Sequence, residues 1–426
     1  MTDRRPLLRA VLDAAIAAAH PNVILVPHLP AAPKGRLICL AAGKGAAAMA
    51  AAAERHYLDV FKFDPDRLIG IATTRNGHRV PTRCVEVVEA GHPVPDEAGR
   101  ESTERTLRLA QSAQEEDLVL VLLSGGGSAN WIAPVDGITF VEKQQLTRSL
   151  LRSGARIDEI NIVRKHLSRI KGGRLARASR RAEVVALAIS DVPFDDPSSI
   201  ASGPTVPDQT TLADARAVIE KYDFLPDEAI RHALRDPQNE SCKPNDPCFA
   251  RTRLELIARP RDALAAAIAA ARKAGYEIID LGADLEGEAR DVAANHARLA
   301  LQARSERKRV AIVSGGELTV TVRGNGRGGP NQEYALALAL ALNGESGIAA
   351  LAADTDGADG GSGVASDPAG AIIDERTLSR AKSRGLDARS YLGNNDASAF
   401  FAEIGDLLQT GPTLTNVNDL RVILVE

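Results

Sequence analysis

The chain has 426 residues, with 52 basic and 56 acidic side chains and only 3% aromatic residues. This length exceeds what one hydrophobic core usually serves, so two domains are expected. Nearly balanced charge, without a basic stripe interleaved with aromatics, argues against nucleic acid as a partner. No apolar run approaches the length of a membrane helix. The composition therefore predicts a soluble protein, most simply an enzyme, with no membrane partner.

The cysteines and the first residues indicate where the protein works. The four cysteines show neither metal-ligand spacing nor a C-x-x-C pair, which favours reduced thiols in a cytoplasmic protein; they are Cys39, Cys84, Cys242 and Cys248. Residues 6–19 have the apolar spacing of an amphipathic helix, and Asp13 interrupts their apolar run. This pattern fits a helix better than a signal peptide.

The first glycine turn follows a predicted strand at 36–41. Gly43, Gly45 and Ala48 fit the G-x-G-x-x-[GA] dinucleotide pattern between a strand and a helix, although the pattern is weak alone. Lys44 lies in the turn itself, where its charge opposes the dipole of the helix that follows. An anionic ligand would explain a lysine at this place. The turn lacks the Ser or Thr and the earlier glycine of a Walker A loop.

Two more strands are predicted at 68–73 and 85–90. The second leads into a loop that contains two prolines and begins at Gly91-His92. His92 could contact a ligand from this rigid loop, although a single histidine is more often structural. A helix from about residue 97 to 113 follows.

The clearest signal is the stretch from Asp117 to Asn130. Six apolar residues, 118–123, predict a strand that is buried on both faces of a parallel sheet. They run into Ser124-Gly125-Gly126-Gly127-Ser128, whose glycines bury no side chain and cost backbone entropy. Such a loop can offer its amide groups to a phosphate at the carboxyl end of a strand. A plain strand-to-helix turn is the alternative, but it needs one glycine rather than three.

A basic helix and an acidic loop complete the first half. Residues 161–171 predict a basic amphipathic helix, ended by Gly172, that carries Arg164 and Lys165. A solvated basic face is the commoner explanation of such a helix. A strand at 184–189 then leads to Asp191, where metal ligands and catalytic carboxylates occur in α/β proteins. The polar, turn-rich segment 237–249 is predicted to link a domain of residues 1–236 to one of residues 250–426.

The second half repeats the alternation of strands and helices. Strands are expected at 254–258, 276–281, 310–313 and 348–353, with helices at 262–273, 286–303 and 331–342. The strand ending at 313 runs into Ser314-Gly315-Gly316-Glu317, which echoes the earlier glycine loop. A hairpin strand at 318–322 and a glycine-rich basic loop with Arg323 and Arg327 follow, and this loop is a second predicted anion site. Asp354, Asp356 and Asp359 resemble a calcium loop, but Ala365 replaces the required Glu, which favours magnesium or substrate contact.

These motifs, in this order, resemble those of the class II D-glycerate 2-kinases, whose C-terminal half is called the MOFRL domain. The likeness covers nearly the whole chain and is carried by 42–44, 91–93, 123–129, 190–192, 202–205, 314–317, 326–333, 354–357 and 411–417. It implies two Rossmann-like α/β domains with mainly parallel sheets and an active-site cleft between them. It also implies ATP- and Mg²⁺-dependent phosphorylation of D-glycerate on its 2-hydroxyl, which gives 2-phosphoglycerate.

The resemblance also suggests roles for individual residues. It maps a catalytic lysine onto Lys44 and expects a catalytic arginine in the later glycine-rich loop. Pro330 stands where that arginine is often found, so Arg327 is the candidate, with Arg323 behind it. Leu414 also replaces an expected glycine. On this scheme both Ser-Gly-Gly loops bind phosphates, and the remaining candidates are Asp191 (hydroxyl or Mg²⁺), Asp356 (Mg²⁺), and His92, Arg164, Lys165 and Asn331 (substrate).

Two other functions remain open at this stage. An NAD(P)-dependent hydroxypyruvate reductase, a label that family members have also carried, would use the Gly43–Ala48 pattern. That pattern expects an acidic residue after a second strand, and neither Asp59 nor Asp64 follows a convincing one. A non-catalytic sugar-phosphate-binding protein would leave Asp191 and Asp356 without a task. A hydrolase is disfavoured because Ser128 lacks the G-x-S-x-G frame. Whether the protein forms a homodimer is not fixed by the sequence.

Overall fold

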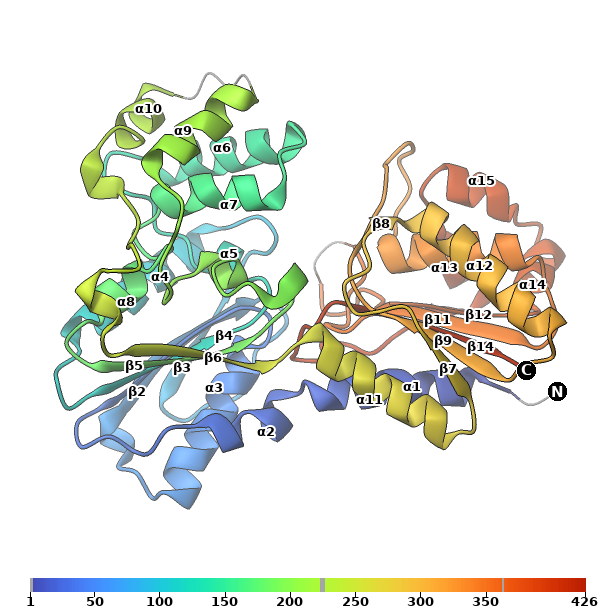
Figure 1. The fold of residues 1–426 in the computed structure, drawn as a ribbon, viewed down its shortest axis with the longest axis horizontal. Coiled ribbons are helices and arrows are strands. Elements are labelled where there is room, and N and C mark those ends of the chain that lie inside the picture. Colours follow the sequence, from blue (N-terminus) through green and yellow to red (C-terminus); the bar gives the residue numbers. More distant parts are fainter. Residues whose placement is uncertain (1–2, 223–226, 362–363) are drawn as a thin grey trace. The chain divides into compact units, whose positions relative to one another are not determined.

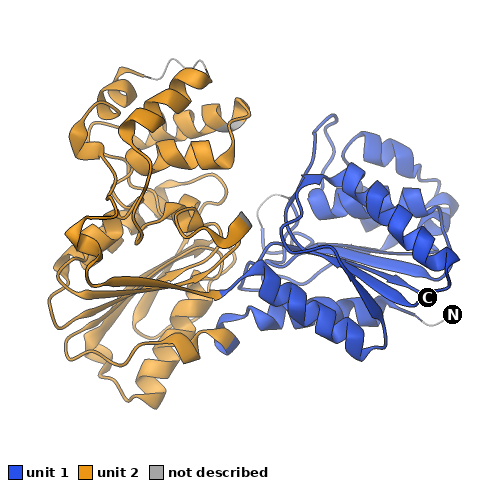
Figure 2. Ribbon diagram, in the orientation of Figure 1, with its two compact units in different colours: residues 1–23, 258–426 blue, residues 24–257 orange. Residues whose placement is uncertain are grey.

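The computed structural model describes residues 3–222, 227–361 and 364–426. They form two compact units (Figure 2): unit 1 comprises residues 1–23 and 258–426, and unit 2 comprises residues 24–257. Unit 2 is therefore inserted into unit 1. This division differs from the predicted one, because residues 237–249 lie inside unit 2 rather than between two domains. They are tied to it by Cys242, whose amide donates to Gly172 O, and by an ion pair between Asp246 and Arg177.

Unit 2 is organised around a six-stranded sheet in the order β3-β2-β1-β4-β5-β6. The pairs β1–β2, β1–β4, β2–β3 and β4–β5 are parallel, as the sequence predicts. Every residue of β1 and β4 is buried, because helices cover both faces of the central strands. The strands are β1 (Leu37–Ala42), β2 (Leu68–Arg75), β3 (Val85–Ala90), β4 (Leu118–Leu123), β5 (Glu183–Ile189) and β6 (Thr252–Ala258).

The helices of unit 2 form two layers above the sheet and one below it (Figure 1). The alanine-rich α3 packs on one face, and α4 and α8 cover the other. Beyond them, α6, α7, α9 and α10 enclose a second hydrophobic core of their own. The helices are α2 (Pro21–Ile24), which crosses the boundary between the units, α3 (Ala46–Arg55), α4 (Glu97–Ser112), α5 (Gly127–Asn130), α6 (Phe140–Arg152), α7 (Ile157–His166), α8 (Arg174–Ala178), α9 (Leu212–Lys221) and α10 (Glu228–Ala233).

Unit 1 is also α/β, but its six-stranded sheet is mixed, in the order β13-β12-β11-β14-β9-β7. Of its pairs, β7–β9 is parallel and the other four are antiparallel. The expectation of a mainly parallel sheet is therefore wrong for this unit. The strands are β7 (Glu277–Asp280), β9 (Val310–Ser314), β11 (Ile348–Asp354), β12 (Gly370–Asp374), β13 (Leu407–Leu408) and β14 (Asp419–Val425).

The predicted hairpin strand at 318–322 is also wrong. Only Leu318–Thr319 is extended, as β10, and it pairs in parallel with β8 (Gly287–Glu288). The side chain of Glu288 accepts the amide of Thr321, which holds the following residues without a ladder.

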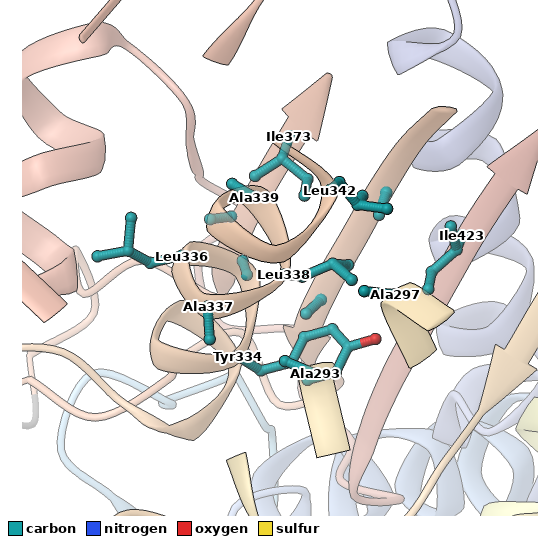
Figure 3. Close-up of a cluster of buried hydrophobic side chains, with 14 of the residues drawn as sticks. Ala293, Ala297, Tyr334, Leu336, Ala337, Leu338, Ala339, Leu342, Ile373 and Ile423 are labelled. Carbon is teal, nitrogen blue, oxygen red and sulfur yellow. The ribbon is translucent and has the colours of Figure 1, made fainter. Parts of the chain in front are cut away.

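The helices of unit 1 cover both faces of its sheet. The helices α1 and α11 pack together on one face, and α12 and α13 on the other (Figure 1). Tyr334 and Leu338 of α13 point to the side of Ala297 and Ile423, and Leu336 points to the opposite side of the helix (Figure 3); all three are buried in the core. None of the described helices is long and apolar enough to cross a membrane. The helices are α1 (Arg5–Ala18), α11 (Pro260–Lys273), α12 (Ala289–Ser305), α13 (Pro330–Leu342), α14 (Thr377–Ser383), α15 (Ala388–Gly393) and α16 (Ala397–Ile404).

One buried histidine makes the stability of unit 1 depend on pH. The Nδ1 atom of His296 lies 2.8 Å from the Tyr334 hydroxyl, and burial, with Arg421 nearby, lowers the pKa of His296 to about 4. The unfolded chain therefore binds a proton first as the pH falls. The buried, neutral His296 therefore makes its full contribution to the stability of the folded state above the ordinary histidine pKa of about 6.5. This contribution is lost as the pH falls from 6.5 to 4.

We expect His296→Gln to reduce the loss of stability on acidification. Between pH 7 and pH 5 the wild type should lose about 2 kcal/mol more than the variant. Urea unfolding followed by circular dichroism at both pH values measures this difference. Tryptophan fluorescence would not report on unit 1, because the single tryptophan, Trp131, lies in unit 2. Equal losses in the two proteins would show that His296 does not titrate in this range.

Candidate active site

The turns that follow β1 and β4 are locked together. The amides of Gly43, Lys44 and Gly45 donate to Thr73 O (3.1 Å), Gly125 O (2.8 Å) and Ser124 Oγ (2.9 Å). Gly43 has a φ of +117°, and a Cβ there would lie 2.3 Å from Ser124 O. Only glycine fits this close approach. The Gly43–Gly45 turn thus uses its own amides to hold β2 and the β4 turn, and these amides cannot cradle a dinucleotide pyrophosphate.

The β4 turn, in contrast, presents unused amides. Gly127 N donates to Ser124 O at 3.3 Å, whereas the amides of Gly125, Gly126 and Ser128 have no acceptor among the described residues. Gly126 adopts a φ of +84°. Successive N–H groups around a left-handed residue form a concave anion site. The prediction of a phosphate loop at Gly125–Ser128 therefore has a geometric basis, while the buried Ser124 holds the two turns together.

The side chains of Lys44 and His92 both lie close to Gly126 of this turn. A methyl group at Gly126 would lie 2.9 Å from His92 Cδ2 and 3.4 Å from Lys44 Cγ. The half-buried His92 and Lys44 are thus brought together at the carboxyl edge of the sheet. Asp191 follows β5 at the same edge, because parallel strands end on one side. The predicted residues Lys44, His92, Gly126 and Asp191 share this region.

A cavity of about 140 Å³ adjoins the turn. Lys143 Nζ donates to the carbonyl oxygens of Arg164 (3.3 Å) and Leu167, and Lys171 Nζ donates to those of Ser128 (2.8 Å) and Trp131 (2.7 Å). Lys143 and Lys171 are only 2% and 1% exposed. The lining residues are His92, Pro93, Pro95, Gly126, Ser128, Ala129, Ile132, Lys143, Thr147, Arg164 and Lys171.

Burial and mutual repulsion weaken the hold of these lysines on their protons. The pKa of Lys171 is lowered to about 7, first by burial and then by Arg164. The pKa of Lys143 is lowered well below its ordinary value by burial and by Lys171, Arg174 and Arg164. An anion in the cavity would offset both effects.

The end of α7 differs from the prediction and explains why Lys171 was missed. The helix ends at His166 rather than at Gly172. Arg174 from α8 donates to the carbonyl oxygens of Lys165 (2.7 Å) and Ser168, so it caps the helix there. The residues after the cap leave the helical path, and Lys171 enters the cavity. Lys143 was missed because α6 was not predicted, although its capping box, Thr139 with Glu142, is visible in the sequence.

Arg164 and Lys165, both candidates for substrate, lie in different surroundings. Arg164 lines the cavity. Lys165 is buried in an ion pair with Asp208, with 3.2 Å between Nζ and Oδ1, and so holds α7 to the loop before α9.

A strained loop that contains Ala201 and Ser202 packs against the β4 turn. Ala201 and Ser202 have φ values of +49° and +60°, which non-glycine residues rarely adopt. Ser202 Oγ lies 2.8 Å from Ser128 Oγ, and a Cβ at Gly127 would lie 2.9 Å from Ala201 Cβ. Strain of this kind persists only where surrounding contacts hold it, and it is concentrated at functional sites.

The second Ser-Gly-Gly loop, in unit 1, is used differently from the first. Arg421, 1% exposed, donates to Ser314 Oγ (3.2 Å) and to the carbonyl oxygens of Gly315 and Gly316. The amide of Gly315 donates to Gly282 O at 2.8 Å. Gly316 packs so closely on Leu285 that a Cβ would lie 2.2 Å from its oxygen. This loop is therefore anchored in its own unit before any ligand binds.

The glycine-rich loop 323–329 is also fastened by protein groups. The amides of Arg323 and Arg327 donate to the side chains of Asn395 (2.7 Å) and Asp396 (3.0 Å). A Cβ at Gly326 would lie 2.3 Å from Asp396 Cβ. Its glycines thus serve close packing on residues 394–396, and these amides are not available to an anion. The side chains of Arg323 and Arg327 are exposed.

Buried carboxylates gather at the start of α13. Asp359 accepts the amides of Asn331 (2.9 Å) and Gln332 (2.8 Å), and Asn331 Nδ2 bridges Asp359 and Asp419. Burial and the neighbouring Asp419 raise the pKa of Asp359 to about 7. Burial raises the pKa of Asp419 as well, and the neighbouring Asp356, 1% exposed, adds to this shift. Asn331 thus contacts carboxylates of its own unit, and its Oδ1 is buried without a donor among the described residues.

These carboxylates do not form a closed metal cage. Among the described residues, the group of three ligands with atoms within 4.8 Å of one another is Cys242, Asp246 and Cys248, which the sequence did not indicate. All four cysteines are free thiols. Mg²⁺ usually takes one or two carboxylates and completes its shell with water and phosphates, so Asp191 and Asp356 fit it as single ligands.

Comparisons with known proteins agree with this architecture. A family model described as a domain of unknown function, DUF4147, matches residues 7–235, and the MOFRL family model matches residues 310–419. The D-glycerate 2-kinase of Thermotoga maritima is 39% identical over 97% of this chain and 97% of its own. An Agrobacterium vitis protein whose name proposes a hydroxypyruvate reductase is 47% identical over 99% of this chain and 94% of its own.

Solved structures give the same result. The crystal structure of a glycerate kinase from Thermotoga maritima superposes with a TM-score of 0.85, at 39% identity and 99% coverage of both chains. A Pyrococcus horikoshii structure matches with a TM-score of 0.77 at 34% identity, covering 100% of this chain and 99% of that one. The fold and the site thus define a two-unit α/β protein of the DUF4147–MOFRL type. The chain belongs to the family that contains the glycerate 2-kinases.

The two glycines Gly126 and Gly137 allow a matched test of the β4 turn. Their φ values are +84° and +82°, but nothing lies within 4 Å of a Cβ at Gly137. We expect both alanine variants to lose about 1 kcal/mol of unfolding free energy. Only Gly126→Ala displaces His92 and Lys44, so only this variant should weaken ATP binding measured by isothermal titration calorimetry. Equal affinity in the two variants would exclude the turn from nucleotide binding.

Proposed function

We propose that the protein is a D-glycerate 2-kinase that uses ATP and Mg²⁺. The 2-hydroxyl oxygen of D-glycerate attacks the γ-phosphorus of ATP, and the bond from that phosphorus to the β–γ bridging oxygen breaks. The products are 2-phosphoglycerate, ADP and the hydroxyl proton. The observation that carries the proposal is the position of Lys44, which lies against Gly126 of a turn with unused amides; Gly126 also lines the cationic cavity.

The unit 2 residues supply charge and orientation. Phosphoryl transfer depends on positioning and on positive charge around the moving group, with little covalent chemistry by the protein. In the proposal, Lys44 contacts the transferred phosphoryl group and the amides of Gly125 and Gly126 bind phosphate oxygens. Asp191, at the end of β5, orients the 2-hydroxyl or takes its proton.

The roles that the resemblance suggests for unit 1 stay predictions: positive charge on the transferred group from Arg327, with Arg323 as the reserve, and nucleotide contact by the loop Ser314–Glu317. Mg²⁺, held by Asp191 or Asp356 together with phosphate oxygens, would neutralise charge on the phosphates. The predicted cleft between the units, the cytoplasmic location and a homodimer stay predictions.

The reductase is the weaker alternative, although a similar protein carries that name. A dinucleotide fold needs the amides of its glycine turn for the pyrophosphate and an acidic residue after the second strand. Here the three amides from Gly43 to Gly45 are already used, and β2 ends in Arg75. Asp59 is paired with Arg83 instead. A non-catalytic sugar-phosphate-binding protein would bind the same ligands without forming ADP.

We expect the purified protein to form ADP from ATP, Mg²⁺ and D-glycerate, with a product that enolase consumes directly. Phosphorus NMR identifies the product as 2-phosphoglycerate. A product that enolase uses only after phosphoglycerate mutase is added would mean attack by the 3-hydroxyl. NADH oxidation with hydroxypyruvate, without any formation of ADP, would favour the reductase.

Lys44→Ala should lower kcat at least about a hundredfold, since it removes charge from the transition state. The exposed Lys34, in the loop before β1, gives the matched control, and Lys34→Ala should leave kcat unchanged. Urea unfolding should place both variants within about 1 kcal/mol of the wild type. Near-normal turnover by Lys44→Ala would remove this residue from the mechanism.

The two arginines of the glycine-rich loop can be separated by single substitutions. Their amides, rather than their side chains, hold the loop, so alanine variants should keep its shape. Arg327→Ala should lower kcat about a hundredfold or more, whereas Arg323→Ala should have little effect. The reverse result would assign the role to Arg323, and two fully active variants would show that neither arginine acts.

A further inference from the structure

The cavity beside the β4 turn concentrates positive charge, and no carboxylate of the described residues lines it. We propose that it is the subsite for the carboxylate of the acceptor, and that Lys143, Arg164 and Lys171 select a compact three-carbon acid. That the acid is D-glycerate rests on the proposed kinase function. That the cavity binds a small organic anion rests on its own charge and size.

The charges around the cavity are of one sign. No Asp or Glu lines it, and Lys143, Arg164 and Lys171 form no ion pair among the described residues. The nearby acids are engaged elsewhere: Asp208 pairs with Lys165, and Glu240 with His166 and Lys243. Burying charges without counter-charges is costly, and proteins keep such an arrangement where a ligand completes it.

The carbonyl oxygens that accept from the two lysines do not supply that missing charge. Lys143 contacts the last turn of α7, whose dipole is equivalent to about half a negative charge. Lys171 contacts two neutral carbonyl groups of the α5 turn. These contacts fix the directions of the amino groups, but they bring no carboxylate to offset the positive charge of the cavity wall.

Of the three cations, Arg164 has the fewest contacts that would explain it by a structural role. Its side chain makes no hydrogen bond or ion pair with any described residue, although burial lowers its pKa. A guanidinium group binds a carboxylate through two parallel hydrogen bonds. An arginine that lines a cavity and has no partner in the protein is therefore suited to bind a carboxylate of the ligand.

The size of the cavity limits the ligand. An engineered cavity of about 150 Å³ accepts benzene, which has six non-hydrogen atoms. The volume of about 140 Å³ therefore suits D-glycerate, with seven, and excludes a nucleotide. Pro93, Pro95 and Ile132 form apolar wall, which disfavours a second carboxylate on the ligand.

The position of the cavity relates it to the phosphoryl-transfer residues. His92 and Gly126 line it, and Gly126 lies against Lys44. An acid whose carboxylate is held by the three cations would thus have its hydroxyl groups near the turn that is proposed to bind phosphate. This arrangement makes Lys143, Arg164 and Lys171 specificity-determining residues for the acceptor.

The decisive variant is Arg164→Met, with Arg148→Met as its control, because Arg148 is exposed on the neighbouring α6. Arg164→Met removes an uncompensated buried charge, so the Tm without ligand should stay equal to that of the wild type or rise. Its affinity for D-glycerate, measured by isothermal titration calorimetry, should fall at least tenfold, with ATP affinity unchanged. Arg148→Met should bind both ligands like the wild type. Unchanged affinity for D-glycerate, or a clear drop in Tm, would overturn the proposal.

A ligand series separates this proposal from the kinase proposal. We expect D-glycerate and L-lactate to raise the Tm of the wild type, and neutral glycerol to have no effect; Lys143→Met should reduce the response to both acids. If the acids bind through Arg164 but no ADP is formed, the anion subsite stands and the kinase function fails. If D-glycerate is phosphorylated equally well by Arg164→Met, with unchanged KM, the kinase function stands and the subsite is wrong.

Discussion

The close contact between the turns after β1 and β4 is the constraint on which the rest of the candidate site depends. Gly43 lets Ser124 approach its backbone, and Ser124 Oγ accepts the amide of Gly45. With the β1 turn thus satisfied, the β4 turn can adopt its left-handed residue at Gly126 and leave amides unused. Lys44 and His92 can then lie close to Gly126. A strained support, Ala201 and Ser202, completes the frame.

The two Ser-Gly-Gly loops show that the same sequence can meet different local demands. In unit 2 the glycines allow close packing and leave amides for a ligand. In unit 1 the buried Arg421 binds the oxygens of Ser314, Gly315 and Gly316, so the same residue types anchor the end of β9. The difference lies in the neighbouring strands: β14 carries an arginine beside its loop, whereas β1 presents a glycine turn. The Ser-Gly-Gly motif therefore indicates a backbone that can pack closely or turn sharply. The residues that contact each loop determine whether its amides stay available to a ligand.

Much of the fold can be predicted from hydrophobic patterning. The strands of unit 2, the helices α4, α11 and α13 and the α/β class follow from periodicity and glycine turns, and the position of Lys44 in the turn between β1 and α3 follows from strand-to-helix context. The mixed sheet of unit 1 does not, because an apolar run carries no information on the direction of its neighbours. Lys143 and Lys171 could not be found either, since their role arises where α6 and the turn after α7 meet. Lys165 and Arg164 are adjacent in sequence, yet a helix turns one toward Asp208 and the other toward the cavity.

The insertion of unit 2 into unit 1 has a consequence for synthesis on the ribosome. The helix α1 leaves the ribosome before unit 2, but its apolar residues, Leu8, Val11, Leu12 and Ala15, pack in unit 1, whose strands all follow residue 257. Domains fold as units while the chain emerges. Unit 2 can therefore fold before α11, β11 and β14, the elements that α1 contacts, have been synthesised. Until then the apolar face of α1 is not covered by unit 1. The sheet it packs against closes only when β14 enters between β11 and β9. The unit that contains α1 is thus completed last, after unit 2.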